Sequence, residues 1–293
     1  MSNTKSPLSP VIDALESAAP LDAPGKKIAA QVRGLLGPGA LKDALSGTWL
    51  GHALHPLLTD LVIGSFVSAT VLDVIGGDDR GRAQERLIGV GIASYAPTAI
   101  TGISDWADSE PAGDGIRRVG LVHAATNSVA LSLYTASLVA RRKGNPARGK
   151  LLGFGGAAAL GAGGLLGGHL SYSQGVGPNQ TAFDEGPADW TPVGDAADLV
   201  EGQPVRVVAD ETPVFLLKHG DGLHAMHDRC SHRGCSLVGK GTLDGEVIEC
   251  NCHGSRFSLH DGSLLRGPAT TDQPLFEVRE SAGRIEVRLA QQV

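Results

Sequence analysis

Four long segments in the first half of this 293-residue chain contain almost no charged side chains. They are residues 56–76, 87–104, 119–140 and 151–172. A helix needs about 20 apolar residues to cross the hydrocarbon core of a bilayer, and each segment is close to that length. A soluble bundle of hydrophobic helices is the alternative, but four such segments in succession disfavour it. The sequence therefore predicts a four-helix transmembrane bundle over residues 51–173, with the lipid bilayer as its environment.

The charge balance excludes one class of partner. Lysine and arginine number 25 against 31 aspartates and glutamates, so the net charge is −6. A nucleic-acid-binding protein usually presents a basic surface, and we therefore expect no nucleic-acid partner. Residues 1–50, which precede the bundle, are predicted to be a polar and amphipathic tail.

Lysine and arginine in the loops predict the orientation of the bundle. The loops at residues 80–86 and 141–150 are basic, whereas the loop at 105–118 has two arginines beside four acidic residues. Cytoplasmic loops of membrane proteins are enriched in lysine and arginine, so both basic loops are predicted to be cytoplasmic. An even number of spans then places both termini, and the whole second half of the chain, on the extracytoplasmic side.

The histidines of the first half all fall near the outer ends of the predicted helices: His52, His55, His123 and His169. Polar groups inside a membrane are costly and tend to be functional. Imidazoles on facing helices can ligate haem b or hydrogen-bond a quinone. The simpler interpretation is that these side chains bind loops and headgroups, because their spacing does not show that the rings converge.

The second half of the chain has a different pattern. Residues 174–189 are rich in glycine, proline and polar residues and are predicted to be a linker. After them, short runs with strand character, such as 205–208, 214–217 and 284–289, alternate with glycine and aspartate turns. The sequence thus predicts α and β structure in separate domains, with an all-β domain at residues 190–293.

All four cysteines lie within residues 230–252, in the runs CSHRGC and CNCHGS. Clustering among histidines indicates a metal site rather than a secreted disulfide scaffold. One cysteine–histidine pair is spaced C-x-H and the other C-x-x-H. Two thiolates and two imidazoles suit either tetrahedral zinc or a [2Fe–2S] cluster with cysteines on one iron and histidines on the other.

The run CSHRGCSL…CNCHGSRF, followed by Gly267-Pro268-Ala269, resembles a Rieske [2Fe–2S] domain throughout residues 190–293. The resemblance implies that Cys230 and Cys250 bind the buried iron and that His232 and His253 bind the exposed iron. It also implies one-electron transfer, with redox donor and acceptor proteins or a quinol as partners.

Cys235 and Cys252 do not fit the ligand spacing. Their presence resembles the Rieske proteins of cytochrome bc complexes, in which a disulfide joins the two cluster loops, and so implies a Cys235–Cys252 disulfide. An oxidising compartment suits such a bridge. Two free buried thiols are the alternative.

Other residues match positions around the cluster in the bc-type family. Ser255 matches a serine that hydrogen-bonds a sulfur, whereas Phe257 stands where that family usually has a tyrosine and has no group to donate. Such bonds raise the potential by stabilising the reduced cluster, so we predict a potential below that of bc-type proteins. The remaining matched positions are Gly234, Gly254, Gly267 and Pro268, the last two in a loop that covers the cluster.

The segments GHALHPLLTD, TGISDW, VGLVHAATNS and GGHLSYS are similar to a family of predicted four-helix bacterial membrane proteins, some of them fused to Rieske domains. This resemblance implies a multi-pass protein of the bacterial cytoplasmic membrane.

The main hypothesis is a membrane-anchored Rieske electron-transfer protein. Two alternatives remain: a quinol-oxidising oxidoreductase with haem or quinone among the membrane histidines, and a redox sensor that uses Cys235 and Cys252. A Rieske non-haem oxygenase catalytic subunit is not expected. Such an enzyme needs a mononuclear iron site in a large domain after the cluster, and only about 40 residues follow His253.

Overall fold

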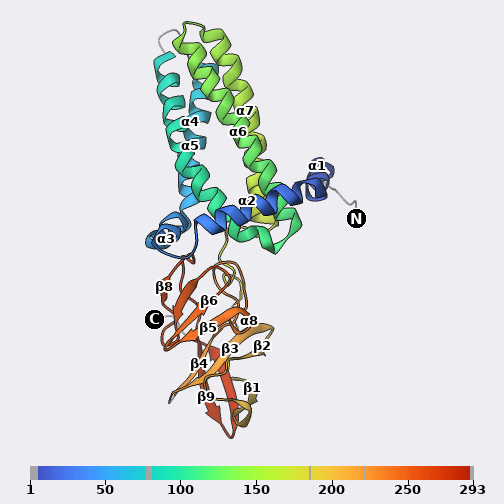
Figure 1. Cartoon of the computed structure of the whole chain (residues 1–293), viewed down its shortest axis with the longest axis vertical. Coiled ribbons are helices and arrows are strands. Elements are labelled where there is room, and N and C mark those ends of the chain that lie inside the picture. Colours follow the sequence, from blue (N-terminus) through green and yellow to red (C-terminus); the bar gives the residue numbers. More distant parts are fainter. Residues whose placement is uncertain (1–5, 77–80, 185, 221, 291–293) are drawn as a thin grey trace. The chain divides into compact units, whose positions relative to one another are not determined.

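The computed structural model describes residues 6–76, 81–184, 186–220 and 222–290. The chain divides into two compact units, Met1–Leu35 with Leu54–Gly177, and Leu36–Ala53 with Pro178–Val293. The first unit is helical and the second is rich in β-strands (Figure 1). Residue 80, the first arginine of the basic loop at 80–86, lies outside the described residues.

Two helical hairpins form the body of the helical unit (Figure 1). The first consists of α4 (Leu54–Ile75) and α5 (Gly81–Ser109), and the second of α6 (Asp114–Arg142) and α7 (Pro146–Gly168). A short 3₁₀ turn (Glu110–Ala112) connects the hairpins, and a π-helical turn (His169–Ser173) follows α7. The shorter helices α1 (Ser9–Glu16) and α2 (Asp22–Leu35), joined by a 3₁₀ turn (Ala19–Leu21), pack against α5 and α6.

The local sequence explains where α7 begins and how closely it packs. Pro146 occupies the first helical turn, where its missing N–H costs nothing, and the Asn145 side chain accepts a hydrogen bond from the Arg148 N–H at 3.1 Å. A Cβ added at Gly156 would lie 2.8 Å from the Tyr134 ring of α6. Glycine therefore lets the two helices approach closely, as small residues do between membrane helices.

Three helices among the described residues are long and apolar enough to cross a membrane: Leu54–Ile75, Arg82–Ala112 and Pro146–Ser173. The third segment predicted to span, residues 119–140, forms part of α6. That helix is 29 residues long, but it is the least apolar of the four and is not among these three. Several large apolar side chains of α4 are exposed on the outside of the bundle, as contact with lipid requires: Leu57, Leu61, Val67, Val71 and Val74.

The described residues of the β-rich unit form three antiparallel sheets. The first has the order β1 (Thr191–Asp195), β10 (Arg284–Leu289), β9 (Phe276–Ser281). The second is β2 (Val205–Ala209), β3 (Thr212–His219), β4 (Gly222–His227). The third is β5 (Gly241–Asp244), β6 (Val247–Cys250), β7 (Ser255–Ser258), β8 (Leu264–Arg266), with the short helix α8 (Leu237–Lys240) before it. A 3₁₀ turn (Ala196–Asp198) follows β1.

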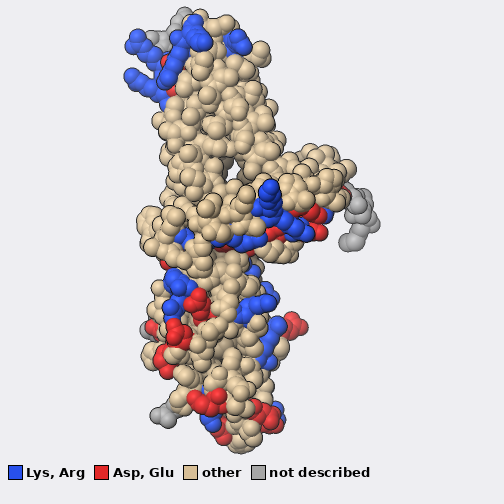
Figure 2. Space-filling model, viewed as in Figure 1, with Lys and Arg blue, Asp and Glu red and all other residues tan. Residues whose placement is uncertain are grey.

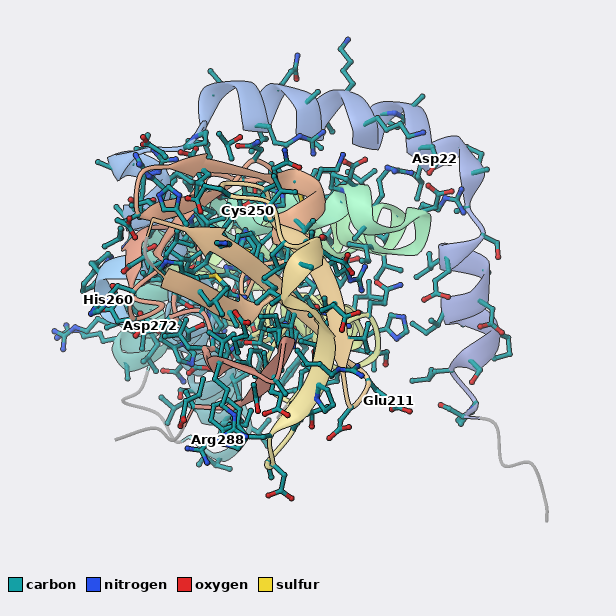
Figure 3. All side chains as sticks on the ribbon, turned by 90° about the horizontal axis from the view of Figure 1, so that it is seen from below. Asp22, Glu211, Cys250, His260, Asp272 and Arg288 are labelled. Carbon is teal, nitrogen blue, oxygen red and sulfur yellow. A yellow bond between two sulfur atoms is a disulfide. The ribbon has the colours of Figure 1, made fainter. Side chains whose placement is uncertain are left out.

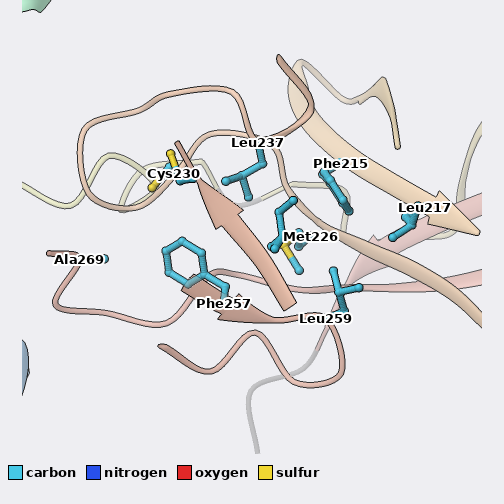
Figure 4. Close-up of a cluster of buried hydrophobic side chains, with 10 residues drawn as sticks. Phe215, Leu217, Met226, Cys230, Leu237, Phe257, Leu259 and Ala269 are labelled. Atoms are coloured by element: carbon cyan, nitrogen blue, oxygen red, sulfur yellow. The ribbon is translucent and has the colours of Figure 1, made fainter. Parts of the chain in front are cut away.

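One hydrophobic core of this unit lies directly below the cysteine-rich loops. Phe215, Met226, Leu237 and Phe257 are fully buried there and pack with Cys230 and other apolar residues (Figure 4). The two cysteine-rich loops therefore pack against a buried apolar core. A second core lies between the β1–β10–β9 and β2–β3–β4 sheets.

Residues 6–50 are largely helical and divide between the two units. Residues 1–35 belong to the helical unit, whereas residues 36–53, which include α3 (Ala40–Ser46) and a 3₁₀ turn (Thr48–Leu50), belong to the β-rich unit.

Candidate metal centre

The four predicted ligands lie on two similar loops. Cys230 follows β4, and Cys250 is the last residue of β6. In each loop a glycine N–H closes a tight turn on the cysteine carbonyl: Gly234 to Cys230 at 2.9 Å and Gly254 to Cys250 at 2.8 Å. Both glycines have left-handed backbones, with φ of +74° and +91°, a conformation that strains other residues. These glycines therefore let each loop fold back around its cysteine.

The structure brings the predicted ligand side chains together as two pairs. Cys230 and Cys250 are buried, and their thiols hydrogen-bond to each other. The rings of His232 and His253 meet edge to face, with centroids 5.0 Å apart. Two sulfurs in the interior and two imidazoles beside each other are the donor set that a [2Fe–2S] cluster with mixed ligands requires.

The surroundings shift the pKa values of the two buried cysteines in opposite directions. The hydrogen bond donated by the Cys230 thiol and those donated by the backbone N–H groups of Cys252 and His253 together lower the pKa of Cys250 to about 7, against the effect of burial. For Cys230, the hydrogen bond that its thiol donates to Cys250 and burial raise the pKa well above its ordinary value, whereas the N–H groups of His232 and Arg233, which hydrogen-bond its sulfur, act in the opposite direction. N–H groups aimed at a sulfur stabilise a thiolate, which is the form that binds metal.

Burial lowers the pKa of His232 well below its ordinary value, and the positive charges of Arg233, His253 and Lys42 act in the same direction. A neutral imidazole is the form that ligates metal. The donor set present, two buried cysteines and two adjacent histidines, therefore fits a [2Fe–2S] cluster with mixed ligands.

A disulfide between Cys235 and Cys252 joins the two loops, as the sequence predicted. The sulfur of Cys250 lies within 4.8 Å of both disulfide sulfurs. The disulfide thus links the two loops next to the predicted ligand Cys250. Its own two sulfurs are bonded to each other.

The residues expected around the cluster have distinct roles in the structure. The Ser255 hydroxyl oxygen accepts a hydrogen bond from the Ala269 N–H at 3.0 Å, which leaves its proton able to donate elsewhere. Phe257 is completely buried in the core and presents only a hydrocarbon ring (Figure 4). Gly267 and Pro268 precede Ala269 in the loop that this hydrogen bond connects to β7.

The sequence reasoning missed the segment that contacts this loop. Thr48 donates its hydroxyl to the Ala269 carbonyl at 3.0 Å, and the Asp43 carboxylate accepts the N–H of Gly267. A Cβ at Gly254 would lie 2.6 Å from Pro38. Thr48 and Ala269 are 221 residues apart in the chain, and no local pattern signals a contact over that separation.

The structure separates the four membrane histidines. His55 Nδ1 lies 3.0 Å from the Thr98 carbonyl, and His123 Nδ1 lies 2.9 Å from the Gly163 carbonyl. These two side chains are close enough to interact electrostatically. His169 instead pairs with Glu16 at 2.8 Å, and His52 is exposed in the other unit.

Known protein families match both halves of the chain. Residues 189–278 match the Rieske [2Fe–2S] domain, and residues 51–180 match a family described as predicted membrane protein (DUF2231). The anthranilate 1,2-dioxygenase ferredoxin subunit of Burkholderia cepacia is 30% identical over 102 residues, which are 35% of this chain and 94% of that protein. Ferredoxin CarAc of Metapseudomonas resinovorans is 35% identical over 99 residues, 33% of this chain and 92% of that protein.

The cytochrome b6-f complex iron-sulfur subunit of Chlorobaculum tepidum is 30% identical over 98 residues, which are 33% of this chain and 52% of that protein. Among solved structures, the ferredoxin of carbazole 1,9a-dioxygenase from Nocardioides aromaticivorans IC177 is 25% identical, covers 35% of this chain and all of that one, and has a TM-score of 0.33.

The chain therefore belongs to the Rieske [2Fe–2S] family, with a DUF2231 membrane domain in the same polypeptide. Its cofactor is a [2Fe–2S] cluster.

Proposed function

We propose that this protein is a membrane-anchored electron-transfer protein in which Cys230 and Cys250 hold the buried iron and His232 and His253 hold the exposed iron. The observation that carries the proposal is the convergence of two buried thiols and two adjacent imidazoles on disulfide-linked loops. When bound, the [2Fe–2S] cluster supplies a one-electron couple.

The chain's own residues hold and insulate this couple. The buried core around Cys230 excludes water from the sulfur side, and the N–H groups aimed at both cysteine sulfurs stabilise negative charge there. The half-buried His232 and His253 rings form the side of the site at which electrons are exchanged with the donor and the acceptor. The similarity to ferredoxins and to a b6-f iron-sulfur subunit supports redox proteins or a quinol as donor and acceptor.

The position of the disulfide favours this function over a redox sensor that uses Cys235 and Cys252. The disulfide joins the two ligand-bearing loops next to Cys250. A cross-link at this position fixes the two pairs of ligands relative to each other. The apolar helices of the DUF2231 domain support the anchor. We place the Rieske domain on the extracytoplasmic side, because the basic loops are predicted to be cytoplasmic.

The ligand assignment is tested with the full-length protein purified in mild detergent. We expect about two irons and two acid-labile sulfides per chain, with a rhombic paramagnetic resonance signal after reduction. His232→Ala and His253→Ala should each abolish both the signal and the sulfide. His260→Ala is the matched control, because His260 is an exposed histidine of the same unit, away from Cys250 (Figure 3). Zinc in place of iron, or a cluster that survives both ligand substitutions, would overturn the assignment.

A further inference from the structure

The two hairpins of the helical unit are structural repeats of each other. Tyr134 on α6 follows Phe66 on α4 by 68 residues, and Arg141 follows Asp73 by the same 68. His123 follows His55 at this offset as well. The same spacing for these three pairs of aromatic, charged and histidine residues indicates that α4 and α6 hold equivalent places in two related hairpins.

The contacts within each hairpin repeat as well. His55 Nδ1 bonds the carbonyl of Thr98 on α5, and its ring packs against Gly102, where a Cβ would lie 2.6 Å from the ring. His123 Nδ1 bonds the carbonyl of Gly163 on α7, and its ring packs against Gly167, where a Cβ would lie 3.0 Å away. In both hairpins the glycine comes four residues after the acceptor, so the histidines have equivalent environments.

Equivalent residues of the two hairpins also touch each other. The rings of Phe66 and Tyr134 stack with centroids 4.1 Å apart and an angle of 3° between their planes. Arg141 makes two hydrogen bonds to the Asp73 carboxylate, at 3.0 and 2.5 Å. A residue can contact its own equivalent only beside the axis that relates the repeats. The α4 and α6 faces that carry these residues therefore line a pseudo-twofold axis, and the His55–His123 pair is the third pair along it.

Hydrogen bonding leaves one ring nitrogen of each histidine as a base. A backbone carbonyl only accepts, so Nδ1 carries the proton and Nε2 carries the lone pair. The Asn127 amide nitrogen lies 3.3 Å from both ring nitrogens of His123. An amide nitrogen at these distances in the plane of the imidazole would clash with the ring carbon between the two nitrogens. The Asn127 amide therefore lies over the face of the His123 ring. The Nε2 lone pair, which lies in the ring plane, stays available. An Nδ1–H held by a carbonyl is also the usual second hydrogen bond of a metal-ligating histidine.

A gap separates the two hairpins near the level of the histidines (Figure 2). The hairpins pack tightly around the stacked rings and the ion pair, and Figure 2 shows an opening between the hairpins just beside α2. The histidines lie toward that end of the bundle, since His55 is in the first turn of α4, and Thr98 and Gly163 are in the second halves of α5 and α7.

We propose that His55 and His123 are the two axial ligands of a haem iron bound between the hairpins on the pseudo-twofold axis. A quinone carbonyl needs an N–H donor, but both N–H groups are already bonded to backbone carbonyls. A bare metal ion needs three or four protein ligands, whereas the symmetric pair offers two. Haem supplies four equatorial nitrogens of its own and needs only the two axial bases. The proposal is independent of the cluster assignment.

The test is the haem content of the full-length protein, expressed with a haem precursor and measured as the pyridine haemochrome. We expect about one haem per chain, with a low-spin spectrum typical of two imidazole ligands. His55→Ala and His123→Ala should each reduce haem per chain at least tenfold. His169→Ala and His52→Ala are the matched controls and should keep it, because their rings bind Glu16 and Ala53 instead.

Two further measurements separate loss of a ligand from loss of fold. The [2Fe–2S] signal is recorded in every sample, so failure of this proposal and failure of the cluster assignment are seen independently. His55→Met substitutes another haem ligand, and we expect it to retain haem with an altered spectrum and a raised potential. Wild-type protein without haem, or both alanine variants with full haem, would overturn the proposal.

Discussion

At the scale of single residues, Phe257 is a buried side chain that we expect to affect the potential of the cluster without being a ligand. It is completely buried beside Cys230 and Ala269 in the core under the two loops. A phenylalanine fills this space as well as a tyrosine does but donates no hydrogen bond. We therefore expect the cluster sulfurs of this protein to receive one donor fewer than a tyrosine hydroxyl at this position would provide.

We predict that Phe257→Tyr raises the midpoint potential. A hydrogen bond that favours the reduced cluster by about 1.4 kcal/mol corresponds to about 60 mV for one electron. A redox titration followed by paramagnetic resonance measures the change, with Phe257→Leu as the control that alters packing and adds no donor. A folded tyrosine variant with an unchanged potential would contradict the prediction.

At the scale of elements, α3 and the 3₁₀ turn after it act as a brace for the loop at Gly267–Ala269. Thr48 bonds the Ala269 carbonyl, and Asp43 bonds the Gly267 N–H. Ala269 in turn bonds Ser255 on β7. The brace, the loop and the second cysteine-rich turn are thus connected by successive hydrogen bonds.

We predict that Thr48→Val lowers the free energy of unfolding of the β-rich unit by about 1 kcal/mol, because valine keeps the shape and leaves the Ala269 carbonyl without its donor. Denaturant unfolding followed by cluster absorbance measures this change. Thr191→Val is the control, since its hydroxyl bonds the nearby Asp189 carbonyl at the surface. Equal stability of the two variants would show that the brace contributes nothing to the loop.

At the scale of the whole molecule, charge and hydropathy describe the relation to the membrane. Lysine and arginine side chains gather at the end of the bundle where α4 joins α5 and α6 joins α7, and the helix surface next to them carries no charge in this view (Figure 2). This distribution agrees with a cytoplasmic location of those connections. The number of spans then decides where the termini lie, since three spans put them on opposite sides and four put them on the same side.

We predict four spans, with α6 crossing the membrane despite its lower hydropathy, because it packs its polar residues against α7 and α4. Alkaline phosphatase, which is active only outside the cytoplasm, is fused to either end of the full chain. Both fusions should be active, and a fluorescent protein fused to either end should be dark after export by the general secretory route. An active fusion at one end alone would indicate an odd number of spans.

The amino-acid sequence was sufficient to predict the features that depend on the spacing of residues close together in the chain. The four helices follow from long runs with almost no charge, and the two cysteine-rich loops follow from short motifs in which ligand types recur at fixed intervals, while the disulfide was implied by the resemblance of these loops to bc-type Rieske proteins. Both signals are complete within a few tens of residues, so no knowledge of distant contacts is needed to interpret them.

Only the tertiary structure decided which distant residues meet. Thr48 reaches Ala269 across 221 residues, and neither side chain is unusual in its own segment. The four histidines of the first half look alike in the sequence, but the fold pairs His169 with Glu16, leaves His52 exposed, and sets His55 and His123 in equivalent places on two hairpins. The physical reason is that a hydrogen bond or an ion pair depends on positions in space to within an ångström, whereas spacing along a chain determines position only within one helix or turn.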